Sequence, residues 1–218
     1  GTAEEGYVIR NTNVEKISIP VEKKWVGKAG KQAEIILKAD EQEKERVTLT
    51  EENGWKHTFE NLPKYDSATG AEIKYTLSEE KLEGYNSVIT GDAEEGFTVT
   101  NTITGKVSIG VTKEWVGPAS ESVTVNLLAD GTKVASQKIT AKENWQYTFT
   151  DLEKYKDGKE IKYEVTEDAV DRYEGEITGT AEEGYVIRNT NVETTIVSGT
   201  KTWNDNNKQD GKRPDHII

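Results

Sequence analysis

Cysteine and methionine are absent from the 218 residues, and histidine occurs only twice, as His57 and His216. Without cysteine the chain has no disulfide, no thiolate metal ligand and no cysteine nucleophile. Two histidines also argue against a Ser–His–Asp triad and against a multi-histidine metal site. We therefore expect no metal, no other cofactor and no enzyme with turnover. The lack of a starting methionine predicts a mature or excised piece of a longer protein.

Positive charge is scarce, because 28 Lys and Arg face 40 Asp and Glu, for a net charge of −12. A nucleic-acid backbone requires a basic footprint, and an anionic membrane surface attracts basic segments. No apolar run approaches the roughly 20 residues of a membrane span. We expect no nucleic-acid partner and no membrane insertion. Five Trp and nine Tyr supply core material, and 19 Gly against four Pro fit a turn-rich β protein.

The chain repeats itself. Residues 1–15 read GTAEEGYVIRNTNVE, residues 179–193 are the same string, and residues 91–102 carry a weaker copy, GDAEEGFTVTNT. The Trp of a K-x-W motif recurs at spacings of 90 and 88 residues, as Trp25, Trp115 and Trp203. A fixed period of this kind is typical of repeat proteins.

Four pieces follow from this period. They are the tail of a preceding repeat (1–13), two complete repeats (14–103 and 104–191) and the first part of a following, incomplete repeat (192–218). Almost no linker separates the complete repeats, and each is acidic, so mutual repulsion favours an extended array. We expect adjacent repeats of the same chain to be partners in an elongated rod.

Apolar residues alternate with polar ones through both repeats, as in Val21, Lys23 and Trp25 or Trp55, His57 and Phe59. Further strands are predicted over residues 33–39, 73–79, 97–101 and 122–129. Short alternating strands separated by Asn-Gly and Asp-Gly turns predict an all-β fold of tandem antiparallel β-sandwiches. A short helix near 79–84 stays open.

Three polar residues fall on the inward face of their strands in each repeat. They are Lys23, Glu79 and Asn101 in the first repeat and Lys113, Glu167 and Asn189 in the second. The Glu-to-Asn separation is 22 residues in both repeats, and the Lys-to-Glu separations are 56 and 54. Charged side chains are rarely buried unless they are paired. The recurrence therefore marks a candidate site.

Three readings of this site compete. The strand faces are misassigned and the residues are solvated; or Lys and Glu form a buried ion pair with Asn as a hydrogen-bond partner; or the amine attacks the Asn side-chain carbonyl while Glu moves the proton, which gives an isopeptide amide. Trp25 and Trp115 share the face of the lysines and would shield the site from water. Pattern alone leaves the ion pair and the covalent bond open.

At these residues the chain resembles the Cna B-type repeats of collagen-adhesin-like proteins on Gram-positive bacteria. The resembling strings are EKKWVG and TKEWVG, NGWKHTFENLPKYD and ENWQYTFTDLEKYKDG, IKYTLSEE and IKYEVTED, and GFTVTNT and GYVIRNT. They cover nearly the whole chain, in the same order in both repeats. The resemblance implies a prealbumin-like β-sandwich set in tandem as the stalk of a cell-wall-anchored, extracellular surface protein.

The resemblance also implies a Lys–Asn isopeptide bond promoted by an acidic residue. Lys23 and Asn101, and Lys113 and Asn189, would be joined, with Glu79 and Glu167 as proton shuttles. Asn11 and Lys201 match the same motifs in the incomplete repeats and lack their usual partners. A host matrix partner would bind through another domain of the full-length protein. The alternative is that these repeats themselves bind a host matrix ligand.

Weaker signals complete the sequence. Glu80 and Asp168 neighbour the proposed shuttles, and a one-residue error in strand register would give them the acid role. His57 is expected to be a core or rim residue. Residues 205–211, DNNKQDG, faintly resemble a calcium loop but lack its closing Glu, so a solvated turn is expected.

Overall fold

The computed structural model describes residues 2–7, 9–204 and 211. The first unit consists of seven strands: β1 (Lys16–Val26), β2 (Ala33–Ala39), β3 (Gln42–Leu49), β4 (Lys56–Pro63), β5 (Tyr75–Glu79), β6 (Tyr85–Asp92) and β7 (Gly96–Ile103). The strands form a four-stranded sheet, in the order β4-β1-β7-β6, and a three-stranded sheet, in the order β3-β2-β5. The two sheets face each other across one core, so the expected sandwich is confirmed.

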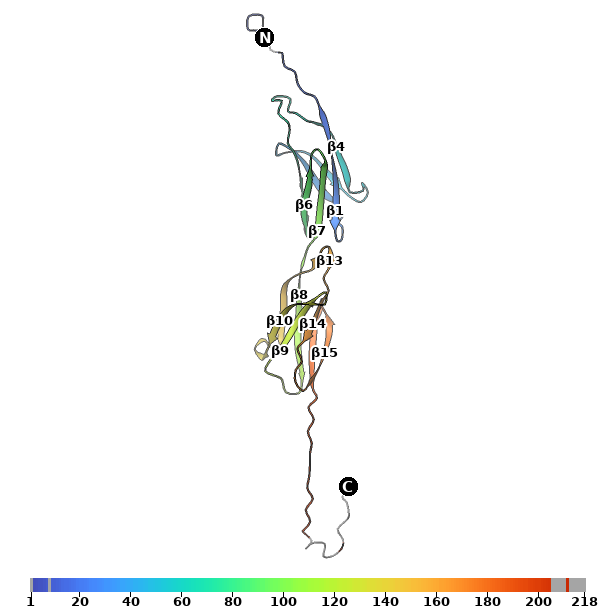
Figure 1. Cartoon of the computed structure of the whole chain (residues 1–218), viewed down its shortest axis with the longest axis vertical. Coiled ribbons are helices and arrows are strands. Elements are labelled where there is room, and N and C mark those ends of the chain that lie inside the picture. The colour runs from blue at the N-terminus through green and yellow to red at the C-terminus, as the bar shows by residue number, and fades with distance from the viewer. Residues whose placement is uncertain (1, 8, 205–210, 212–218) are drawn as a thin grey trace.

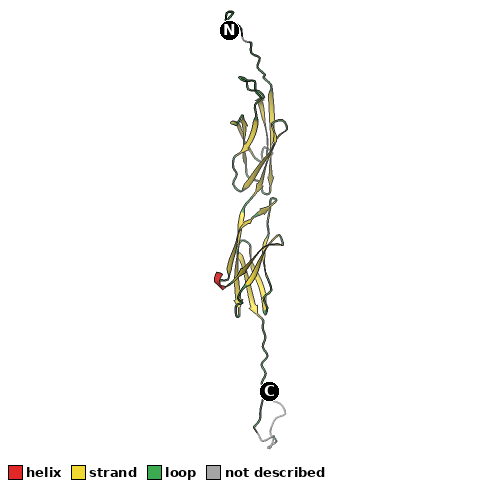
Figure 2. Ribbon diagram, turned by 60° about the vertical axis from the view of Figure 1, so that its left-hand side comes forward, coloured by secondary structure: helices red, strands yellow, loops and turns green. Residues whose placement is uncertain are grey.

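The second unit repeats the arrangement. Its elements are β8 (Lys106–Val116), β9 (Val123–Ala129), β10 (Thr132–Ile139), a turn of 3-10 helix η1 (Ala141–Glu143), β11 (Gln146–Glu153), β12 (Tyr155–Lys156), β13 (Lys159–Glu160), β14 (Tyr163–Glu167), β15 (Tyr173–Thr180) and β16 (Gly184–Asn191). The sheets are β11-β8-β16-β15 and β10-β9-β14, and β12 and β13 form a separate hairpin. The two units lie end to end, and the described chain is elongated (Figures 1 and 2).

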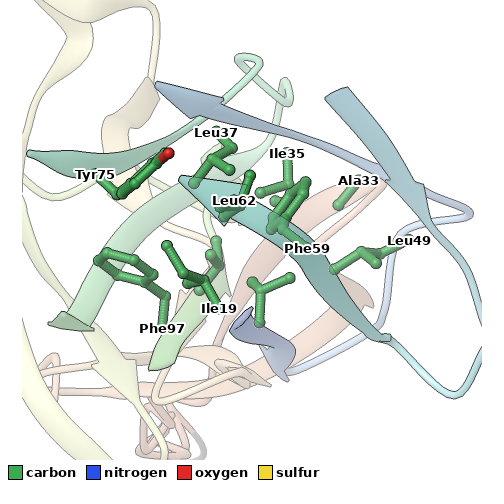
Figure 3. Packing of buried hydrophobic residues seen from close by; sticks show 11 residues of the cluster. Ile19, Ala33, Ile35, Leu37, Leu49, Phe59, Leu62, Tyr75 and Phe97 are labelled. Carbon is green, nitrogen blue, oxygen red and sulfur yellow. The ribbon is translucent and has the colours of Figure 1, made fainter. Parts of the chain in front are cut away.

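The core of the first unit lies between its two sheets. Ile19, Phe59 and Phe97 come from the four-stranded sheet, and Ile35 and Leu37 come from the facing one (Figure 3). Their burial follows the two-residue period of the strands, since successive side chains point to opposite faces of a sheet. The second unit has a corresponding core from its own two sheets.

One feature departs from the antiparallel expectation. β1 pairs with β7 in parallel, and β8 pairs with β16 in parallel, whereas the other strand pairs are antiparallel. These are the first and last strands of each unit, so the chain enters a unit at one end and leaves at the other. Alternation along a strand carries no information about the direction of its neighbour, which is why the sequence did not reveal this pairing.

Strand limits also differ from expectation. The alternation predicts Ile73 and Trp55 in strands, but both lie in the preceding loops. Trp55 has a left-handed backbone (φ 60°), as does its counterpart Trp145 (φ 58°). A bulky residue rarely adopts this conformation. The helix considered near 79–84 is not formed, since β5 runs to Glu79 and a loop and turn follow.

Candidate functional site

Neighbouring strands of the four-stranded sheet carry the lysine and the asparagine. In the parallel ladder of the first unit, Lys23 on β1 is opposite Val99 on β7, and Trp25 is opposite Asn101. Lys23 is 3% exposed and Asn101 is fully buried. The two polar side chains therefore point into the core, two residues apart along the ladder, as their place on the inward face predicts.

The glutamate reaches the same point from the facing sheet. Glu79 is on β5, opposite Ile35 of β2. Its Oε1 lies 3.2 Å from Lys23 Nζ and accepts a hydrogen bond of 3.1 Å from Asn101 Nδ2. One carboxylate oxygen thus contacts both the amine and the amide nitrogen. The expectation that these three residues are solvated through a strand error does not hold.

The second unit brings the equivalent residues together. Lys113 Nζ lies 3.2 Å from Glu167 Oε1, with no exposure of the lysine side chain and 9% exposure of the glutamate. Asn189, on the neighbouring strand β16, is 1% exposed. No hydrogen bond between Asn189 and Glu167 is formed among the described residues, in contrast to the first unit.

Burial changes the chemistry of the two lysines. Desolvation lowers the pKa of the Lys23 amine, and the attraction of Glu79 offsets only part of this effect. The same balance lowers the pKa of Lys113 beside Glu167. Each amine also donates a hydrogen bond of 3.4 Å to a backbone carbonyl, of Val99 or Ile187. A lowered pKa increases the neutral fraction of an amine, and the neutral amine is the nucleophile.

Each asparagine keeps one polar atom without a partner. Asn101 Oδ1 and Asn189 Oδ1 are buried and accept no hydrogen bond within the described part of the chain. An unsatisfied buried acceptor costs roughly 1–3 kcal/mol. In this arrangement the amide is not held by a full set of hydrogen bonds, which leaves its carbonyl free to be polarised.

Aromatic rings close the site on one side. Lys23 Nζ lies 4.4 Å from the ring centroid of Trp25, and Lys113 Nζ lies 4.5 Å from that of Trp115. Each tryptophan makes edge-to-face contacts with two further rings at 5.0–5.2 Å, which are Trp55 and Tyr85 in the first unit and Trp145 and Tyr173 in the second. Such a cluster excludes water from the amine.

The alternation of apolar and polar residues does not assign the outer rings of this cluster to the site. Their signal was the repeat itself, because Trp55 and Trp145 are 90 residues apart and Tyr85 and Tyr173 are 88 apart. The left-handed backbone at Trp55 and Trp145 turns these indoles towards the site tryptophans. Backbone strain of this kind often occurs at functional sites.

The neighbouring acids lie elsewhere. Glu80 Oε1 is 3.0 Å from Arg46, and the Glu80 side chain is 54% exposed. Asp168 Oδ1 accepts a hydrogen bond of 2.8 Å from Asn126 Nδ2, whose Oδ1 in turn accepts one from Ser136. Neither acid contacts a site lysine. The polar side chain of Asn126, 6% exposed, is a further buried group that the sequence analysis did not single out.

The remaining candidates are not brought into a site. Asn11 and Lys201 are exposed in segments without strand structure, and Lys201 Nζ lies 4.8 Å from the ring of Trp203. His57 is half-buried against Phe59, with ring centroids 4.8 Å apart. Most of the 205–211 segment and His216 lie outside the described residues.

Two further features are absent from the described residues. They contain no cluster of three or more His, Cys, Asp or Glu side chains arranged to hold a metal ion. None of their helices has the length and apolar character needed to cross a membrane.

Comparison with known proteins gives three regions of similarity to one family. The sequence model of the Cna protein B-type domain matches residues 19–102, 109–190 and 197–218. Over 177 residues the chain is 41% identical to the collagen adhesin of Staphylococcus aureus, an alignment that covers 78% of this chain and 14% of that protein. The chain therefore spans a small part of this relative.

Solved structures of the same group also match. Two B repeat units (B1B2) of the collagen-binding protein of Staphylococcus aureus share 35% identity with this chain, with a TM-score of 0.48, covering 91% of this chain and 56% of that one. A single B1 unit of that protein shares 28% identity, with a TM-score of 0.39, covering 82% of this chain and all of the other.

Proposed function

The chain belongs to the Cna protein B-type domain family, and we propose that it is a structural stalk module of a bacterial cell-wall-anchored surface protein, strengthened by an isopeptide bond in each complete repeat. As a surface-protein repeat, the module does not turn over a substrate. Its partners are the adjacent repeats, and a host matrix ligand would be bound by another domain of the full-length protein. The observation that carries the proposal is the single Glu79 oxygen shared by Lys23 Nζ and Asn101 Nδ2.

That shared oxygen suits a proton relay. The neutral Lys23 amine attacks Asn101 Cγ, and a new C–N bond forms. Glu79 takes a proton from Nζ and gives it to Nδ2, the bond from Cγ to Nδ2 breaks, and ammonia leaves. The reaction consumes one amine and one primary amide and yields one secondary amide and ammonia, with no oxidant or reductant. Lys113, Glu167 and Asn189 would follow the same course.

The aromatic cluster supports the reaction in two ways. Trp25 and its neighbouring rings keep water from the amine, which maintains its lowered pKa. The same rings exclude water from the product, so hydrolysis of the amide is disfavoured. The buried ion pair alone would be weak support for stability, because desolvation of the two charges offsets their attraction.

A bond between the first and last strands fits a load-bearing stalk. A pull on the two ends of the chain enters the first unit through β1 and leaves through β7. The bond would carry the load from Lys23 to Asn101, and the 78 residues of separation between them (101 − 23) would be bypassed. Extracellular exposure and proteases are conditions in which such a lock is useful.

The test is the intact mass of the denatured chain. Each bond removes one ammonia, about 17 Da, because a covalent modification changes the mass. We expect a deficit of about 34 Da for the chain and about 17 Da for Glu79→Ala or Glu167→Ala. Fragment masses should correspond to β1 peptides linked to β7 peptides and to β8 peptides linked to β16 peptides. A mass equal to that of the plain sequence would reduce the sites to buried ion pairs.

Direct binding of a host matrix ligand by these repeats is the alternative function. The name of the collagen adhesin applies to a protein of which this chain covers 14%. That alternative would be favoured if the two-repeat chain bound immobilised matrix protein saturably and if variants without the mass deficit bound it equally well.

A further inference from the structure

The two units touch through glycine. The β12–β13 hairpin of the second unit lies at the foot of β1 and β7 of the first (Figure 1). A Cβ added to Gly158, at the hairpin tip, would lie 2.4 Å from Gly27 N and 2.7 Å from Val26 C. A Cβ added to Gly27 would lie 2.7 Å from Gly158 O. The two backbones are therefore in contact, with no space for a side chain on either.

The hairpin tip is a preformed element. Asp157 (φ 50°) and Gly158 (φ 77°) connect β12 and β13 in two residues, both with positive φ. These angles are typical of a type I′ turn, which matches the twist of the flanking strands. Gly27, which directly follows β1, also has positive φ (95°). The contact is thus made by a tight hairpin turn on one side and a bend with positive φ on the other.

The linker between the units is held from both sides. Only Thr104 and Gly105 separate β7 from β8. Thr104 N donates a hydrogen bond of 2.8 Å to Gly84 O of the first unit, and Gly105 O accepts one of 2.8 Å from Lys154 N of the second. With both backbones fixed, little rotational freedom remains in the linker itself.

The second unit has an equivalent surface at the end away from the first unit, and this surface is exposed. Val26 is half-buried next to the hairpin, whereas its counterpart Val116 is 49% exposed. Gly117 follows β8 with positive φ (112°), as Gly27 follows β1. The linker hydrogen bond also recurs there, since Val192 N donates to Arg172 O at 2.9 Å.

We propose that the Gly27–Gly158 contact is a docking joint that fixes the angle between successive repeats, and that the exposed end at Val116 and Gly117 is the seat for the corresponding hairpin of a following repeat. The matched segment at 197–218 is where such a repeat begins. The joint does not depend on the isopeptide bonds, because none of its residues belongs to a Lys–Glu–Asn site. It makes the array a rod of set geometry.

The experiment compares two glycine substitutions in the complete 218-residue chain. Gly158→Ala introduces a Cβ at φ 77°, where it meets the first unit. Gly131→Ala is its matched control: it follows Asp130 in a two-residue hairpin turn, has the same φ of 77°, and its Cβ meets nothing within 4 Å. The local backbone strain is therefore equal, and the contact between units differs.

Residual dipolar couplings measured separately for the two units report their relative orientation. We expect one common alignment tensor for the parent chain and for Gly131→Ala, and two different tensors for Gly158→Ala. If Gly158→Ala showed one common tensor and the parent orientation, the proposed joint would be contradicted. Independent tensors in the parent chain would contradict it as well.

A second pair guards against a folding defect in the hairpin. A Cβ at Gly27 would meet Ile103 at 2.5 Å as well as Gly158, and a Cβ at Gly117 would meet Asn191 at 2.9 Å. Gly27→Ala should decouple the units, whereas Gly117→Ala should leave their orientation unchanged. The mass deficit should be the same in all four variants, so failure of the joint is distinguishable from failure of the cross-links.

Discussion

Gly175 lies directly opposite Asn189 in the β15–β16 ladder, and a Cβ at this glycine would be 3.0 Å from Asn189 Oδ1 and 3.6 Å from Glu167 Oε2. The first unit places Ser87 opposite Asn101 at the equivalent point. The glutamate of the second site is 9% exposed, against 3% in the first. The second site is the less covered of the two, where a side chain is missing from the neighbouring strand.

Gly175→Ser should stabilise the second unit by about 0.5 kcal/mol, because glycine inside a strand has excess entropy in the unfolded chain. The 3.0 Å approach requires Asn189 to shift slightly, and the first unit accommodates a serine at this point. Thermal unfolding measures the gain, and intact mass should show the deficit retained. The reverse change, Ser87→Gly, should destabilise the first unit. Loss of the deficit in Gly175→Ser would mean that the glycine is needed for the bond.

Asn101→Ala should lose one of the two mass deficits and destabilise the first unit by about 4 kcal/mol, since an open chain replaces a closed loop. Guanidinium unfolding of the two units provides the measurement. Asn86→Ala is the control, because Asn86 is exposed on the adjacent strand β6. Equal destabilisation by both changes would contradict a cross-link at Asn101.

In Trp25→Leu a large fraction of the molecules should lack the first cross-link. Loss of the ring 4.4 Å from Lys23 Nζ admits water, and the pKa of the amine moves back towards its ordinary value. Phe59→Leu removes another buried ring from the same core, on β4 opposite Ile19, and should reduce stability while it keeps the full deficit. The readout is the ratio of molecules with the first cross-link to molecules without it, measured by intact mass in each purified variant. Equal cross-linking in both variants would assign Trp25 to packing alone.

The stability difference between Asn101→Ala and the parent chain should shrink as the pH rises towards about 10.4, the ordinary pKa of a lysine amine. In Asn101→Ala the amine of Lys23 titrates with a lowered pKa in the folded state, so over this range the unfolded state binds more protons and stability increases with pH. In a cross-linked parent this nitrogen would be an amide and would not titrate. Tyrosine ionisation affects both chains alike. A constant difference across the range would indicate a free amine in the parent.

Glu80→Gln and Asp168→Asn should both keep the full mass deficit. Glu80 pairs with Arg46 at the surface and Asp168 with Asn126, so neither acid reaches a site lysine. Exposed ion pairs contribute about 0–1 kcal/mol, which predicts a small loss of stability for Glu80→Gln. Loss of a mass deficit in either variant would show that Glu80 or Asp168, and not the neighbouring Glu79 or Glu167, is the proton shuttle.

The sandwich and the inward polar residues were predictable because both depend on local alternation. Lys23, Glu79 and Asn101 stand where apolar residues belong, and the second repeat shows the same departure. Strands β6 and β15 were not predicted, since most of their residues are exposed and show no alternation. The aromatic cluster depends on left-handed backbone at Trp55, and the parallel pairing depends on topology. Neither is encoded in the period of one strand.

The parallel pairing of first and last strands has a consequence for the length of the whole array. Because the chain leaves each unit at the end opposite to its entry, every added repeat advances the chain in one direction and none folds it back. The identical strings at 1–15 and 179–193 lie two repeats apart. Gain or loss of such a pair of repeats would change the length of the array in fixed steps, while the fold of each repeat stayed the same.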